Sequence, residues 1–347
     1  MRYCEYNYDV NVGIVGASGY TGAELLRICA GHPEFDVQVV QAHTHAGELV
    51  GAVYPSLLPA YEGVAFTPIV AEALFDLDLV FLGLPHGQSQ SIMPRLVDSP
   101  VPYILDLAAD FRLSDPKVYQ KWYERKHSAA DLLTQFVYGL PELNRDRLKG
   151  ARLIAVPGCY PTAASLALAP FTLKGVLDKQ GIVVDAASGL SGAGRALSDA
   201  THFSVANEDF SVYGVLNHRH TPEIEQVCKA EVLFTPHLAP MTRGILATCY
   251  GRPSRPIDTE QALQVLREEY EHCPFIIVQE DLPATKQVLG SNYARISARV
   301  DERTGWAVLL CAIDNLVKGA AGQGVQCANL AVGFEETTGL ESLSLFP

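Results

Sequence analysis

The sequence predicts an α/β protein of two domains: a Rossmann-type, doubly wound parallel sheet, and an α+β domain with a mixed or antiparallel sheet. Three observations predict this class. The 347 residues exceed the size at which one hydrophobic core usually stops growing. Short apolar runs alternate with helix-length intervals over about the first 150 residues, and extended segments dominate after Pro157. With 48% hydrophobic and 19% charged residues, the composition is that of a compact folded protein.

The first domain opens with a strand, a tight turn and a helix. Residues 12–15 form a short apolar run, residues 16–22 read GASGYTG, and apolar residues at helical spacing follow. Further apolar runs at 37–41, 77–83 and 102–107 are separated by helix-length intervals. This alternation predicts parallel βαβ units with right-handed crossovers.

The second domain contains extended segments with few helices between them, which predicts a mixed or antiparallel sheet. Residues 314–330 are rich in small residues with helix-like apolar spacing, and we expect them to pack back against the first domain. We therefore expect one domain at 1–157, joined by 317–347, and a second domain at 158–316. The expected strands are 181–187, 232–240, 244–250, 293–300 and 306–313.

Charge, cysteine spacing and apolar run length limit which partners, metal sites and cell compartment we expect for this chain. The net charge of −13 repels nucleic acid and anionic membranes, so neither is expected as a partner, and anionic small molecules need local Arg, Lys or N–H groups. The eight cysteines form no Cys-x-x-Cys pair, so neither a disulfide framework nor a metal site is predicted. The first ten residues lack the features of a signal peptide, and no apolar run reaches the roughly 20 residues that cross a bilayer, so we expect a cytoplasmic protein.

The glycine-rich turn is a candidate dinucleotide site. Gly13, Gly16, Gly19 and Gly22 fall at every third residue between the first strand and the first helix. Glycine permits a left-handed turn and close approach of the backbone to a pyrophosphate, and the helix N-terminus offers free N–H groups to that anion. A tight turn without a ligand is the alternative.

The loop after the second strand bears on the choice of cofactor. Residues 41–45 read QAHTH and contain no Asp or Glu, the residue that holds the ribose 2′-hydroxyl in NAD-binding versions. NADP is therefore expected, with Thr44 as a candidate contact alongside His43 and His45. No Arg or Lys stands close by in the sequence, so this expectation depends on the absence of a carboxylate.

Cys159 is the candidate nucleophile. It lies in Pro157-Gly158-Cys159, directly before an Ala-rich helix, and we expect the positive end of that helix to favour the reactive thiolate. The alternative is that Cys159 is a buried, unreactive cysteine. We expect the other seven cysteines to be of this unreactive kind.

Two histidines are candidates for acid–base catalysis. His218 and His220 precede Thr221 and Pro222, which predict a helix with Thr221 as N-cap. The positive helix end disfavours imidazolium and keeps a base available. We expect His218 to transfer the proton, and His220 to support the position of His218 or the cofactor. Metal binding by the pair is not expected, because no further ligand cluster accompanies it.

Arginines are candidates for holding the anionic groups of a substrate. Arg195 follows a Gly-rich run and Arg243 lies in PMTRG, and either could pair with a phosphate or carboxylate. Asp110 and Arg112 form either a structural ion pair or part of the site rim.

Seven segments resemble, in order, the signature blocks of the N-acetyl-γ-glutamyl-phosphate reductase family of arginine biosynthesis. The resemblance covers about residues 11 to 330, and the seven segments together are far more specific than any one of them. The segments are 16–22 (GASGYTG), 109–112 (ADFR), 138–142 (YGLPE), 157–162 (PGCYPT), 188–195 (SGLSGAGR), 218–223 (HRHTPE) and 315–320 (NLVKGA).

The resemblance implies the fold of the aspartate-semialdehyde and glyceraldehyde-phosphate dehydrogenases, NADPH as reductant, a thioacyl-enzyme on Cys159, and a homo-oligomer, usually a tetramer. It implies reduction of N-acetyl-γ-glutamyl phosphate to N-acetylglutamate 5-semialdehyde and phosphate. The implied cofactor contacts are Gly16, Ser18, Gly19, Tyr20, Thr21, Gly22, Thr44, Ser188, Gly189, Gly192 and Asn315. The implied substrate contacts are Arg112, Arg195, His220 and Arg243.

Three departures from the family pattern stand out. Val156 replaces a common Asn before Pro-Gly-Cys, Glu48 stands where a basic residue is frequent, and Gly324 replaces Ala. Two alternatives stay open: a carrier-linked α-aminoadipyl-phosphate reductase of lysine biosynthesis, which the net charge of −13 disfavours, and a non-catalytic NADP(H)-binding protein.

Overall fold

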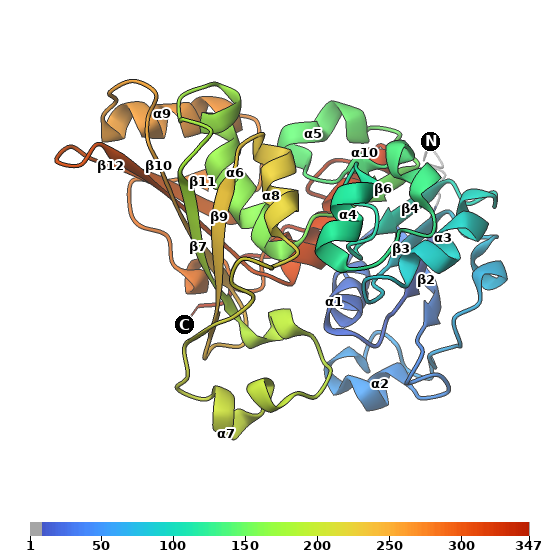
Figure 1. Ribbon diagram of the computed structural model, residues 1–347. Helices are drawn as coiled ribbons and strands as arrows, with labels where there is room; N and C mark the ends of the chain where they lie inside the picture. The colour runs from blue at the N-terminus through green and yellow to red at the C-terminus, as the bar shows by residue number, and fades with distance from the viewer. Residues whose placement is uncertain (1–8, 347) are drawn as a thin grey trace, which may run out of the picture.

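A computed structural model describes residues 9–346 as two sheets with helices packed around them (Figure 1). The first sheet is wholly parallel, with strand order β2-β1-β3-β4-β6-β5. The second sheet is mixed, with order β11-β12-β13-β10-β7-β9-β8. The predicted fold class is confirmed.

The parallel sheet forms the first half of the chain. Its central strands β1 and β3 are almost wholly buried, because helices cover both faces. The strands are β1 (Val10–Val15), β2 (Phe35–Gln41), β3 (Leu79–Leu82), β4 (Tyr103–Asp106), β5 (Val137–Tyr138) and β6 (Leu153–Ala155). The helices are α1 (Tyr20–Cys29), α2 (Val50–Val53), α3 (Ser89–Val97), α4 (Pro116–Tyr123) and α5 (Pro141–Leu148), with 3-10 turns η1 (Pro55–Leu57), η2 (Ala71–Leu74) and η3 (Ala130–Gln135).

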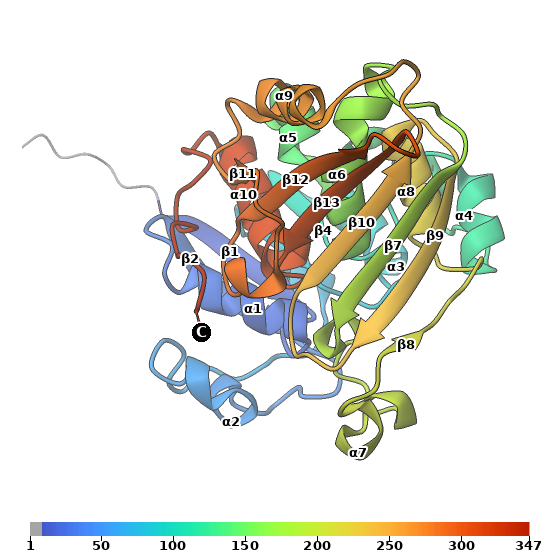
Figure 2. The ribbon, with the colours of Figure 1, turned by 90° about the vertical axis from the view of Figure 1, so that its left-hand side faces the viewer.

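The mixed sheet alternates buried and partly exposed residues along its long strands, as in β10. One face packs on α6, α8 and α9, and in Figure 2 no helix lies across the other face. The strands are β7 (Ile182–Gly189), β8 (Ser211–Val212), β9 (Val232–Ala239), β10 (Ile245–Gly251), β11 (Ile276–Val278), β12 (Ala294–Asp301) and β13 (Trp306–Ile313). The helices are α6 (Cys159–Leu173), α8 (Thr221–Cys228) and α9 (Thr259–Tyr270), with the 3-10 turn η6 (Thr285–Gln287).

The end of the chain returns to the parallel sheet. A π-helical turn, η7 (Val317–Ala321), leads into α10 (Gly322–Val332). Side chains of α10 such as Val325 and Ala328 share a buried core with Val12 of β1 and Leu25 of α1. The small residues of this segment let the helix approach the sheet closely.

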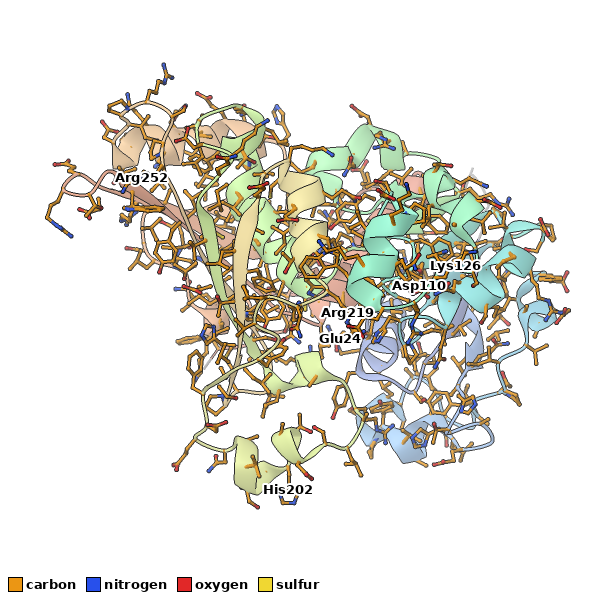
Figure 3. The ribbon with its side chains drawn as sticks, in the orientation of Figure 1. Glu24, Asp110, Lys126, His202, Arg219 and Arg252 are labelled. Carbon is orange, nitrogen blue, oxygen red and sulfur yellow. The ribbon has the colours of Figure 1, made fainter. Side chains whose placement is uncertain are left out.

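A long arm joins β7 to α8. It contains the short turns η4 (Leu190–Ala193) and η5 (Asp199–Thr201), the helix α7 (Phe203–Ala206) and the edge strand β8. The arm extends away from the mixed sheet on the same side of the molecule as α2 (Figure 1), and His202 lies near its tip (Figure 3).

Two strands of the parallel sheet were not predicted, β5 and β6. They are two and three residues long, too short for a periodic pattern to show in the sequence. No helix within residues 9–346 combines the length and apolar character that crossing a membrane requires.

Candidate active site

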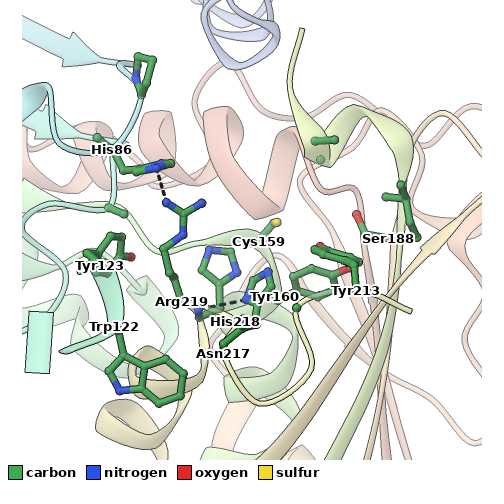
Figure 4. Close-up of a pocket in the computed structure, with 18 of the residues that line it drawn as sticks. His86, Trp122, Tyr123, Cys159, Tyr160, Ser188, Tyr213, Asn217, His218 and Arg219 are labelled. Carbon is green, nitrogen blue, oxygen red and sulfur yellow. Dashed lines mark hydrogen bonds between the residues drawn. The ribbon is translucent and has the colours of Figure 1, made fainter. Parts of the chain in front are cut away.

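A cavity of about 1150 Å³ opens where the two sheets meet, and Cys159 lies on its wall (Figure 4). Loops that follow β3 and β4 form one side, and α6, the arm and the segment before α8 form the other. Of the residues expected from the sequence, the cavity wall includes Cys159, His218, His220, Arg112, Ser188 and Gly192.

Cys159 is the first residue of α6, after Gly158 as N-cap. Among the seven cysteines within residues 9–346 it alone is partly exposed, and the other six are buried. Removal from water nevertheless raises the pKa of its thiol to about 11, against smaller lowering effects of the Tyr160 backbone N–H and of Arg112. The helix start lowers the pKa as expected from the sequence, but desolvation outweighs it in the substrate-free site.

Gly158 contacts the side chains of Glu223, His220 and Arg112. Its backbone N–H donates to Oε1 of Glu223 at 2.9 Å. A Cβ at this position would lie 2.5 Å from Nε2 of His220 and 2.9 Å from Nη1 of Arg112. Only glycine lets both side chains rest on the backbone beside Cys159.

The two histidines are neutral and lie edge to face, with ring centroids 4.8 Å apart. Burial lowers the pKa of His218 to about 4, with Arg219 adding to the effect, and burial lowers that of His220 well below its ordinary value. Nδ1 of His218 accepts the backbone N–H of His220 at 3.1 Å. Because Nδ1 is an acceptor, the proton of the neutral His218 ring is on Nε2.

The start of α8 differs by one residue from the prediction. The helix begins at Thr221, with His220 rather than Thr221 at the N-cap and no side-chain cap bond. His220 Nδ1 is buried without a hydrogen-bond partner among residues 9–346.

Arg112 is held rigidly with one amino group turned to the site. Its Nε donates to the carbonyl of Val156 at 2.8 Å and its Nη2 to that of Leu107 at 2.7 Å. Its Nη1 lies 3.6 Å from Oε2 of Glu223. Arg112 forms no ion pair with Asp110, because the buried Asp110 carboxylate instead accepts from the backbone N–H of Gly87, from Ser89 at the start of α3 and from Tyr119 of α4.

The structure does not bring Arg243 to the cavity. Its Nη2 lies 2.7 Å from Glu24 of α1, and its Nη1 lies 3.5 Å from Asp314, which is fully buried. Glu24 lies between the two sheets in Figure 3. Arg243 thus joins α1 to the mixed sheet, and its guanidinium is shared by two carboxylates.

Arg195 also lies away from Cys159. Its Nη1 donates to the carbonyl of Ser18 at 3.2 Å, and its guanidinium carbon lies 5.2 Å from the centre of the Tyr54 ring. The sequence placed Arg195 with the substrate, whereas the fold places it on the glycine-rich turn.

The glycine-rich turn has the shape that a dinucleotide requires. Gly16 has a φ of +78°, and a Cβ there would lie 2.4 Å from the carbonyl of Gly83. A Cβ on Gly22 would lie 2.5 Å from the carbonyl of Gly16. Gly19 caps α1 without a side-chain bond, and the first turn holds no acidic residue. The N–H groups of Tyr20 and Thr21 are thus left for an anion, which fits a pyrophosphate.

The other expected cofactor contacts lie in different surroundings. Ser188 and Gly192 face the cavity, and a Cβ on Gly192 would lie 2.8 Å from Oγ of Ser188. Asn315 lies behind them, where Oδ1 accepts the Gly244 N–H at 2.7 Å and Nδ2 donates to Ser191 at 2.9 Å. Two further positions differ in setting: Gly189 packs against the backbone of residues 242–243, and Thr44 is exposed in the loop after β2.

Arg219 is a residue that the sequence analysis missed. It lines the cavity between His86 and His218 (Figure 4) and contacts His86. Its guanidinium carbon lies 5.5 Å from the centre of the Tyr123 ring. Within residues 9–346 no carboxylate forms an ion pair with it. Its place between two candidate histidines in His-Arg-His was the available signal. The same residues contain no group of three or more His, Cys, Asp or Glu side chains that could hold a metal.

Comparisons with known proteins agree with this arrangement. Residues 11–151 match the family model "Semialdehyde dehydrogenase, NAD binding domain", and residues 159–315 match "Semialdehyde dehydrogenase, dimerisation domain". An aspartate semialdehyde dehydrogenase II from Vibrio cholerae has a similar fold, with a TM-score of 0.70 at 17% identity over 94% of this chain and 98% of that one.

Curated relatives cover nearly the whole chain. N-acetyl-gamma-glutamyl-phosphate reductase from Symbiobacterium thermophilum is 48% identical over 95% of this chain and 97% of its own length. The protein of the same name from Desulforudis audaxviator is 46% identical over 97% of this chain and 100% of its own length. The chain binds a nicotinamide cofactor through its first sheet, and it belongs to the N-acetyl-gamma-glutamyl-phosphate reductase family.

Proposed function

We propose that this chain is an NADPH-dependent enzyme that reduces N-acetyl-γ-glutamyl phosphate to N-acetylglutamate 5-semialdehyde and phosphate in arginine biosynthesis. The observation that carries the proposal is Cys159, partly exposed at the start of α6 on a cavity wall that it shares with His218, His220 and Arg112. The names and full-length identity of the curated relatives support the choice of substrate.

Acyl transfer is the first step. Sγ of Cys159 bonds to the acyl carbon, the bond from that carbon to the phosphate oxygen breaks, and the thiol proton leaves with the phosphate. Because the resting thiol has a pKa of about 11, this proton must move as the bond forms. The proposal assigns the anionic group of the substrate to Nη1 of Arg112, which lies next to Gly158 with His220 beside it.

Reduction of the thioester is the second step. The nicotinamide, when bound, supplies the hydride. His218 presents Nε2–H and donates a hydrogen bond to the oxygen that becomes anionic when the thioester carbon is reduced. The carbon–sulfur bond then breaks, the aldehyde leaves, and the Cys159 thiolate takes up a proton through His218.

Further parts of the proposal concern cofactor and assembly. We infer that NADPH is preferred over NADH, since no Asp or Glu occupies residues 41–45. We also infer a homo-oligomer, a tetramer or dimer, in the cytoplasm, with residues 158–316 as the catalytic and oligomerisation domain. Residues 1–157 and 317–347 then form the dinucleotide-binding domain.

The test is the reverse reaction. N-acetylglutamate 5-semialdehyde, phosphate and NADP should give NADPH, and Cys159→Ser should bind NADPH as the wild type does while keeping less than about a tenth of the turnover. Cys249→Ala, a buried cysteine of β10, is the matched control and should stay active. Turnover only with a carrier-linked α-aminoadipyl semialdehyde would favour the lysine-pathway alternative. Dinucleotide binding without turnover on either substrate would favour a non-catalytic role.

A further inference from the structure

The region that would face the adenosine half of a dinucleotide has no cation of its own. Between Arg27 and Arg95 the sequence holds neither Lys nor Arg, but seven acidic residues. Arg27 is paired with Glu24 at 2.7 Å. A phosphate group bound at the carboxyl end of β2 would therefore find no Lys or Arg in this part of the chain.

The histidine that could replace a cation in this loop is already engaged. Nδ1 of His45 lies 3.0 Å from Oε1 of Glu48. His43 and Thr44 are exposed. The end of β2 therefore offers a phosphate no Lys or Arg of its own.

Arg195 supplies the missing charge from the other sheet. The arm that carries it turns at Gly194, whose φ is +81°, and brings the guanidinium to the carbonyl of Ser18 in the glycine-rich turn. Tyr54 supports this position, because its hydroxyl donates to the same carbonyl at 2.7 Å and its ring lies under the guanidinium.

The guanidinium keeps donors free for a ligand. Its Nη1 contacts Ser18 and Tyr54. Within residues 9–346, Nε and Nη2 have no hydrogen-bond partner, and no carboxylate forms an ion pair with Arg195. Two parallel N–H donors held beside an uncapped helix start match the geometry of a phosphate group.

We propose that Arg195 binds a phosphate group of the nicotinamide dinucleotide, either the 2′-phosphate or the pyrophosphate, and does not bind the substrate. This inference rests on the proposed function, since it takes the cofactor to be a nicotinamide dinucleotide. The arm that carries Arg195 also contributes Ser198, Thr201 and Tyr213 to the cavity wall. Cofactor binding would thus hold the arm against the first sheet and help to enclose the substrate.

The experiment is a calorimetric titration of the purified full chain with NADPH, NADH, 2′-phospho-ADP-ribose and ADP-ribose. The variants are Arg195→Ala and Arg195→Lys, with Arg303→Ala as a control at an exposed arginine. Arg195→Ala should weaken NADPH by about 10–100-fold, the usual worth of a charge-assisted contact, and Arg195→Lys should weaken it less. The control should bind all four ligands as the wild type does.

The four ligands separate the two phosphates. Weakening confined to NADPH and 2′-phospho-ADP-ribose would assign Arg195 to the 2′-phosphate, and equal weakening of all four would assign it to the pyrophosphate. Unchanged affinity for all four ligands in Arg195→Ala, with or without a raised substrate KM, would overturn the inference. A wild-type chain that binds none of them would instead refute the proposed function.

Discussion

Oε1 of Glu223 accepts the backbone N–H of Gly158 at 2.9 Å, so a buried carboxylate in the first turn of α8 holds the residue that precedes Cys159. The same oxygen accepts the Tyr138 hydroxyl at 2.8 Å, and the other oxygen faces Arg112 at 3.6 Å. Because His218 and His220 lie just before α8, this carboxylate sets the position of the histidines relative to the thiol.

Glu223→Gln should keep the fold and lower kcat by about tenfold, because the amide oxygen still accepts the Gly158 N–H but no longer balances Arg112. Glu223→Ala should lower the free energy of unfolding by roughly 3–5 kcal/mol, the cost of leaving a buried charge without its partner. Urea unfolding and steady-state kinetics measure the two effects. If a folded Glu223→Ala enzyme kept the wild-type kcat, Glu223 would have a purely structural role.

The Cys159 thiol should lose its proton only at high pH. Since burial raises its pKa to about 11, alkylation of the substrate-free enzyme by iodoacetamide should accelerate tenfold per pH unit from pH 7 to 9 without levelling off. Mass spectrometry should find the label on Cys159 before any buried cysteine. A plateau near pH 7 would mean that the thiolate is already formed and that the histidines or α6 stabilise it.

His218→Asn should reduce turnover by about 10²–10⁴, because the hydrogen bond and proton from Nε2 are lost at the reacting oxygen. His220→Asn should act more on substrate KM, since that ring lies against Gly158 and Arg112. The pH profile of kcat decides between them. Loss of a limb with His220→Asn and its survival in His218→Asn would reverse the two roles.

The folded protein should lose stability in mild acid through His218. Its pKa is lowered from 6.5 to about 4, so the unfolded chain takes up the proton first as the pH falls. The stabilisation is present above about pH 6.5 and is lost as the pH falls toward 4. Between pH 7 and 5, urea unfolding of the wild type should lose roughly 1–2 kcal/mol more than His218→Asn does. Equal losses would show that the pKa of His218 is not lowered in the folded state.

Local sequence patterns predicted most of the fold and three of the residues that line the cavity. The apolar runs and their spacing predicted a parallel sheet followed by a mixed one, because strand and helix periodicity are written in neighbouring residues. Short elements such as β5 carry too few residues to show a period. Cys159, His218 and His220 stand out because Pro, Gly and Thr beside them mark turns and helix starts.

The sequence by itself determined the glycine-rich turn, the cysteine at the start of α6 and the two histidines before α8. Each of these features depends only on residues that are neighbours in the sequence. Only the tertiary structure decided where Arg195 and Arg243 go, because Ser18 and Glu24, their partners, lie 177 and 219 residues away. It also decided that the Cys159 pKa rises, because desolvation is set by every element around the thiol.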